Sequence, residues 1–219
     1  MTSSFLWTLR SFKHFVNGSS ICQAGPVEKR GRGRRPAAQV RGEILDAAGK
    51  LLLDEGMGAF TIERVAAEAG ASKTTIYKWW ASKGALALDG YFHAVESTLA
   101  FPDTGDIERD LLTQIRAFAR LLTRTRAGRV IAELIGQAQT DEDLAAALLE
   151  HYSGPRRQLA VAAMERARER GELAAGVDFE VVVDQLWGAC YHRLLLPNLP
   201  ITEKFATSLV RNVLRGIRA

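Results

Sequence analysis

Two short helices separated by a very tight turn are the feature that most constrains the fold of this chain. Residues 60–86 read FTIERVAAEAGASKTTIYKWWASKGAL. Thr61 and Ser72 are residue types that begin helices, and the glycine of the intervening turn, Gly70, ends the first helix. Two short helices joined in this way predict a helix-turn-helix, in which the second helix lies in the DNA major groove.

Two further helices are predicted on either side of this pair. Apolar residues recur at helical spacing over residues 40–52, and Gly56 with Gly58 follows them. Ser82 is an N-cap residue type for the helix on the other side, and Lys83 occupies its first position. Because a helix N-terminus carries partial positive charge, Lys83 is well placed to bind a phosphate.

The second helix of the pair has one polar and one apolar arc, since successive helical residues are rotated by about 100°. The polar arc holds Lys73, Thr74, Tyr77 and Lys78, and the apolar arc holds Ile76, Trp79 and Trp80. Ammonium, hydroxyl and phenol groups are the chemistry of phosphate and base-edge contact. We expect Ile76 and Trp80 in the core. Trp79 has two interpretations, pure packing or a phosphate contact through its indole N–H.

Positive charge is concentrated toward the N-terminus. Residues 27–84 hold 11 lysines and arginines against 7 acidic residues, a net charge of +4, whereas residues 85–219 hold 16 against 18, a net charge of −2. The run KRGRGRR contributes Lys29, Arg30, Arg32, Arg34 and Arg35. It is interpreted either as a solubilising tail or as a basic arm that docks on DNA phosphates or enters a minor groove.

Residues 1–36 as a whole are predicted to be a disordered extension, with a secretion signal as the alternative for the first 25 residues. Cys22 and Cys190 have neither disulfide-framework nor zinc-site spacing, which favours a reducing cytoplasm. No apolar run approaches the roughly 20 residues of a membrane-spanning helix, so we expect no membrane partner.

The rest of the chain predicts further amphipathic helices and thus an all-α fold. They cover residues 111–122, 130–138, 141–171, 178–196 and 202–217. Residues 153–155, Ser-Gly-Pro, are expected to break or sharply kink the third of these. The last two helices are apolar over much of their circumference, which predicts a second buried face and a four-helix interface between two copies of the chain.

Enzymatic signatures are absent from the sequence. His93 and Glu96 share a helix face and Glu150 precedes His151, but neither pair has the third ligand that a catalytic metal site needs. No nucleophile elbow, phosphate-binding glycine loop or dinucleotide fingerprint occurs. We therefore expect no enzyme activity, no cofactor and no metal.

Residues 41–92 resemble the DNA-binding domain of the TetR (tetracycline repressor) family of bacterial transcriptional regulators. The resemblance implies operator contacts from Thr61, Ser72, Lys73, Thr74, Tyr77, Lys78 and Lys83, and Thr75 and Trp79 complete our set of candidates. The sequence departs from the family pattern in two places. Trp79-Trp80 replaces a common His-Phe, and Thr74 stands where glycine is frequent.

The same resemblance implies a homodimer and an effector cavity among the C-terminal helices. Candidate lining residues are Phe118, Gln137, Trp187, Tyr191 and His192, although Trp187 and Tyr191 have simple core packing as an alternative. The expected domains are an extension with a basic arm (1–36), a helix-turn-helix domain (37–84) and a helical regulatory and dimerisation domain (85–219). We expect a repressor released from operator DNA by an unidentified small molecule. The alternatives are a helical ligand-binding protein or enzyme with a non-functional DNA-binding head.

Overall fold

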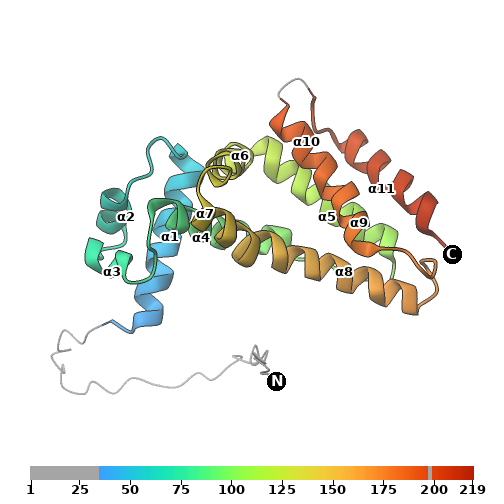
Figure 1. Cartoon of the computed structure of the whole chain (residues 1–219), viewed down its shortest axis with the longest axis horizontal. Helices are drawn as coiled ribbons and strands as arrows, with labels where there is room; N and C mark the ends of the chain where they lie inside the picture. Colours follow the sequence, from blue (N-terminus) through green and yellow to red (C-terminus); the bar gives the residue numbers. More distant parts are fainter. Residues whose placement is uncertain (1–34, 197–198) are drawn as a thin grey trace, which may run out of the picture. The chain divides into compact units, whose positions relative to one another are not determined.

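Helices make up nearly all of the regular structure in the described residues, 35–196 and 199–219, of this computed structural model (Figure 1). The α-helices are α1 (Ala37–Glu55), α2 (Ile62–Glu68), α3 (Lys73–Tyr77), α4 (Lys83–Val95), α5 (Ile107–Arg124), α6 (Ala127–Ala138), α7 (Glu142–Ala147), α8 (Gly154–Glu169), α9 (Phe179–Val183), α10 (Ala189–Leu195) and α11 (Glu203–Ile217). A 3₁₀ turn spans Ser97–Leu99, and π-helical segments span Leu148–Ser153 and Asp184–Gly188. These ranges contain no β-strand, so the all-α prediction is confirmed.

Helices α1 and α4 cross at very short range and form the frame of the N-terminal part. A methyl group on Gly90 would lie 2.6 Å from the Cβ of Ala48, and one on Gly49 would lie 2.7 Å from the Gly90 carbonyl oxygen. Only glycine permits this approach. The fully buried side chains of Ile44, Leu52 and other apolar residues then fill the space around α2 and α3.

Of the break or sharp kink expected at residues 153–155, the break is not formed, and that part of the prediction is wrong. The chain stays helical from α7 through the first π-helical segment into α8. The Gly154 N–H donates to the Leu149 carbonyl, five residues back. Pro155 stands in the first turn of α8, where its missing N–H and fixed φ are tolerated. The wider π turn thus lets the proline be accommodated without ending the helix.

The C-terminal helices bury one face each around a shared core. Helix α11 packs on α5, and α8 packs on α9 (Figure 1). The α5 face contributes Leu111, Ile115, Phe118 and Leu122 to the buried set. The β-branched run of residues 179–183 is helix α9, as its later helical period predicts. No helix in the described part of the chain is both long and apolar enough to cross a membrane.

Candidate DNA-binding surface and effector cavity

The helix-turn-helix is defined locally by two side-chain caps and one left-handed glycine. The Thr61 hydroxyl accepts from the Arg64 N–H at 3.2 Å, and the Ser72 hydroxyl accepts from the Thr75 N–H at 3.0 Å. Gly70 adopts φ +57°, a conformation that non-glycine residues rarely take. The predicted starts of α2 and α3 are therefore confirmed.

Helix α3 divides as its arcs predict. Ile76 and Trp80 are buried, while Lys73, Thr74 and Lys78 are exposed. Tyr77 is 54% exposed, so its phenol is accessible to a partner. A row of cationic and hydroxyl groups on an anchored helix is the arrangement that DNA contact requires.

The helix ends sooner than the apolar arc suggests. Its last residue is Tyr77, and the N–H groups of Trp79 and Trp80 both donate to the Ile76 carbonyl at 3.0 Å. Trp79 therefore lies in the turn after α3, with its ring edge-to-face against Trp80 and 37% of its surface exposed. Both of its interpretations remain compatible with this position.

The remaining predicted DNA contacts differ in how free their polar atoms are. The Thr61 and Ser72 hydroxyls already act as caps, and half-buried Thr75 shares a 2.8 Å hydrogen bond with the Ser72 hydroxyl. Lys83 is exposed at the first position of α4, whose N-cap is Ser82. Lys83 is thus better placed to bind a phosphate than Thr61, Ser72 or Thr75.

Lys73 is paired in the DNA-free protein, a feature that its sequence position did not reveal. Its ammonium group lies 3.0 Å from a carboxylate oxygen of Glu63 on α2. This hydrogen bond raises the pKa of Lys73 and lowers the pKa of Glu63. The lysine remains charged, but a phosphate must compete with Glu63 for it.

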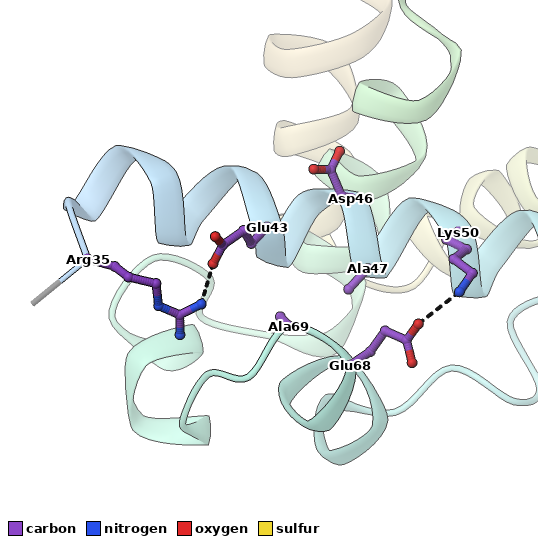
Figure 2. Close-up of a pocket in the computed structure, with 7 residues that line it drawn as sticks. All are labelled: Arg35, Glu43, Asp46, Ala47, Lys50, Glu68 and Ala69. Atoms are coloured by element: carbon purple, nitrogen blue, oxygen red, sulfur yellow. Dashed lines mark hydrogen bonds and ion pairs between the residues drawn. The ribbon is translucent and has the colours of Figure 1, made fainter. Parts of the chain in front are cut away.

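Arg35 is the basic-arm residue that the described ranges include; Lys29, Arg30, Arg32 and Arg34 lie outside them. Its guanidinium donates to the Gly70 carbonyl in the helix-turn-helix turn at 2.6 Å and to a carboxylate oxygen of Glu43 on α1. Figure 2 shows Arg35 reaching along α1 toward Glu43. Arg35 therefore connects the start of α1 to the turn before the recognition helix.

The hollow in Figure 2 lies between α1 and α2 and has a volume of about 330 Å³. A second ion pair, Lys50 with Glu68 at 2.8 Å, joins the two helices there. The cations that line this hollow already have carboxylate partners. We therefore interpret it as a structural contact between α1 and α2 and not as a binding site.

Asp89 on α4 joins three parts of the chain. One carboxylate oxygen accepts from the Trp80 indole N–H at 2.8 Å and lies 3.4 Å from the Arg41 guanidinium. The other lies 3.1 Å from a ring nitrogen of His151 in the first π-helical segment. The Arg41 guanidinium also stacks 5.4 Å from the Trp80 ring centroid. These residues are far apart in sequence, so no local pattern could reveal their contact.

A cavity of about 440 Å³ lies among the C-terminal helices. Of the five candidate lining residues, Phe118, Trp187 and Tyr191 line it. Gln137 and His192 are exposed and do not. The sequence reasoning missed Tyr152, whose hydroxyl lies 3.2 Å from that of Tyr191, and Arg156. Burial raises the pKa of Tyr191, so its phenol stays neutral.

The histidines singled out as conceivable metal ligands have other partners. His93 lies 2.8 Å from a carboxylate oxygen of Asp46, and His151 contacts Asp89. Within residues 35–196 and 199–219, no three His, Cys, Asp or Glu side chains are grouped to hold a metal ion.

Comparison with known proteins places both halves of the chain in one family. The family model described as "Bacterial regulatory proteins, tetR family" matches residues 44–89. The model described as "Tetracyclin repressor-like, C-terminal domain" matches residues 101–213. The first match contains the whole helix-turn-helix, and the second contains the cavity.

Individual relatives agree. An uncharacterized HTH-type transcriptional regulator of Bacillus subtilis (strain 168), YdeS, is 38% identical over 87% of this chain and 95% of its own length. A DNA-binding transcriptional repressor, TetR, of Mycobacteroides abscessus is 33% identical over 78% of this chain and 90% of its own. The crystal structure of the TetR family transcription regulator SCO0332 is 60% identical, with a TM-score of 0.78 over 81% of this chain and 98% of that chain. On this evidence the chain belongs to the TetR family of helix-turn-helix transcriptional regulators.

Proposed function

We propose that the protein is a repressor that binds an operator as a homodimer and leaves it when a small molecule occupies the 440 Å³ cavity. The observation that carries the proposal is the recognition helix α3. Its exposed Lys73, Tyr77 and Lys78 are fixed in place by buried Ile76 and Trp80.

Specific contacts are proposed from this exposed surface. Lys73 and Lys78 meet phosphates or guanine, Thr74 and Tyr77 meet base edges or backbone, and Lys83 adds a phosphate at the α4 N-terminus. We add Thr61, Ser72 and Thr75 as residues that contact the DNA backbone. Trp79 is added as a contact at the edge of the same surface. We place the basic arm, residues 29–35, on phosphates near the recognition helix, because Arg35 is anchored at its turn.

Dimerisation is proposed through α9, α10 and α11. Val181 and Leu195 are exposed although the opposite face of the same helical stretch is buried. On α11, Phe205 and Leu209 are only partly covered within one protomer. Pairing these faces across a two-fold axis buries them and sets two α3 helices at a fixed separation, as half-sites require.

The effector switch is proposed to act through the first π-helical segment. Tyr152 in this segment lines the cavity, and its neighbour His151 contacts Asp89. Asp89 in turn accepts a hydrogen bond from the Trp80 indole, just after the turn that follows α3. A ligand that displaces Tyr152 therefore acts on the position of α3 through two hydrogen-bonded contacts.

The domain division (1–36, 37–84, 85–219) stays part of the proposal, with α4 running across its second boundary. We assign the protein no enzymatic role and place its action in the cytoplasm, where bacterial DNA is accessible.

Selection of bound DNA from a random pool, followed by mobility shift on the selected sequence, tests the function. Tyr77→Ala should lose most sequence-specific affinity, because the exposed phenol reaches the duplex. Lys50→Ala, which removes a cation paired within the hollow of Figure 2, is the matched control and should bind nearly as the wild type does. Failure to enrich any sequence, or equal loss in both variants, contradicts the proposal.

A further inference from the structure

Arg156, in the first turn of α8, lies at the boundary of two cavities. One is the 440 Å³ cavity described above. The other, of about 530 Å³, is bordered by residues of α4, the segment after it and α8, including Phe92, Glu96 and Phe101. Arg156 lines both. Its charge is therefore available to a molecule in either space.

This arginine has no carboxylate partner among the described residues. Its Nε is buried and makes no hydrogen bond. The next residue, Arg157, provides the contrast, since its guanidinium is paired with Glu180 and Asp184. Withdrawing a cation from water without a counter-ion is unfavourable, so an unpaired arginine at a cavity wall favours an anionic occupant.

Two aromatic rings hold the Arg156 guanidinium in position. It lies 5.4 Å from the centroid of the Tyr152 ring and 5.9 Å from that of Phe92. Such cation–π contacts offset part of the cost of burial, but they supply no hydrogen-bond acceptor. The buried Nε–H still lacks an acceptor. A carboxylate offers two oxygens in a geometry that matches a guanidinium.

The charged residues that line the two cavities favour an anion in the 440 Å³ cavity. Its charged lining residues are Arg156, Arg157 and Asp184, and Asp184 is already paired with Arg157. The larger cavity instead has the carboxylate of Glu96 on its wall. The 440 Å³ cavity therefore favours an anion, whereas Glu96 offsets the charge of Arg156 in the larger one.

The rest of the first cavity is aromatic. Phe118 and Tyr191 stack edge-to-face, with ring centroids 5.5 Å apart, and Trp187 adds a third ring from the second π-helical segment. Flat aromatic ligands pack well against such walls.

We propose that the effector is an aromatic anion whose ring system lies among Phe118, Trp187 and Tyr191 and whose carboxylate or similar acidic group pairs with Arg156. This inference rests on the proposed function, because it takes the 440 Å³ cavity as the effector site. It adds the ligand's chemical class and the residue that recognises its charge.

Two fluorescent probes that differ by one acidic group test the inference in the full-length dimer. They are 8-anilinonaphthalene-1-sulfonate and its uncharged counterpart N-phenyl-1-naphthylamine. Arg156→Gln should weaken binding of the sulfonate by about tenfold or more, because the charged hydrogen bonds are lost. It should change binding of the neutral probe by less than about twofold. Arg156→Lys, which keeps the charge, should recover part of the sulfonate affinity.

Displacement of the sulfonate locates the site. Naphthalene-2-carboxylate should compete with it, and naphthalene-2-carboxamide should compete at least about tenfold less well. Glu96→Gln is the matched control and should leave these ratios unchanged. Equal loss of both probes in Arg156→Gln, unchanged sulfonate binding, or equal competition by acid and amide would overturn the inference.

Operator binding separates this inference from the proposed function. Ligand-free wild type and ligand-free Arg156→Gln are both tested for binding to the selected operator. If neither protein binds DNA, the repressor function is wrong, while the probe experiment still judges the anion site. If both proteins bind DNA but the Arg156→Gln substitution does not weaken sulfonate binding, only the anion inference fails.

Discussion

At the scale of single residues, the proposed recognition surface is a set of exposed side chains. One of its cations, Lys73, is already paired with a carboxylate. Lys73 is bound to Glu63, and both side chains are exposed to solvent. Exposed pairs of this kind contribute little to stability. Their importance lies in competition, because Glu63 both neutralises Lys73 and adds negative charge beside the proposed DNA-binding surface.

Glu63→Gln is therefore expected to tighten operator binding by about twofold to fivefold at low salt, within the range of an exposed ion pair. Mobility shift or fluorescence anisotropy measures the effect. Glu68→Gln is the control, since it changes the net charge equally but frees Lys50 instead. An equal gain in both variants would show that overall charge, and not Lys73, is responsible.

Cys190 gives a residue-scale prediction that depends on pH. Burial raises the pKa of its thiol to about 12. A folded-state pKa above the unfolded one stabilises the protein below the unfolded value, near 9, and this contribution is lost as pH rises toward 12. In a Cys22→Ser variant, Ellman's reagent at pH 8 should label Cys190 far more slowly in native protein than in denaturant. Labelling at the rate of a free thiol would contradict the assigned burial.

At the scale of helices, the helix starts could be predicted from the sequence. The contacts between residues far apart in the chain could not. Helix starts at Thr61, Ser72 and Ser82 follow from caps that act within three residues. The π turn before Pro155 was missed because packing of a whole helical stretch decides how a proline is accommodated. The contacts of Asp89 could not be predicted from the sequence either, because only the fold brings its partners together.

The crossing of α1 and α4 depends on its two glycines. Gly90→Ala should destabilise the protein by about 1–3 kcal/mol, because the new methyl group meets Ala48. Gly42→Ala is the matched control in α1, where nothing lies within 4 Å of the new atom. It should be neutral or stabilising by up to about 1 kcal/mol. Urea unfolding of both variants measures the difference, and equal stabilities would refute the close crossing.

At the scale of the whole molecule, the all-α fold class and the helix-turn-helix were predicted from the sequence. The cavity was predicted only in part. Phe118, Trp187 and Tyr191 converge on it, but Gln137 and His192 do not, because helix-face arguments cannot tell which side of a C-terminal helix faces inward. Tyr152 lines the cavity from the first π-helical segment, and Arg156 lines it from the first turn of α8, which follows that segment. No helical wheel predicts the altered periodicity of the π turn.

Assembly gives the prediction at this scale. Val181→Glu should weaken dimerisation by at least about tenfold, because it places a charge in the proposed interface. Leu159→Glu is the control, since Leu159 is a similarly exposed apolar residue on α8, outside the proposed interface. Sedimentation velocity over a concentration series measures both. A dimer equally stable in the two variants would place the interface elsewhere.

Footprinting of the full-length protein on its selected operator shows whether two copies of α3 contact DNA. We predict two protected patches related by a two-fold axis, with centres about 34–36 Å or a multiple of this apart. Both patches should disappear together in Tyr77→Ala. A single patch, or protection that survives Tyr77→Ala unchanged, would contradict the account of α3 as a recognition helix presented twice to DNA.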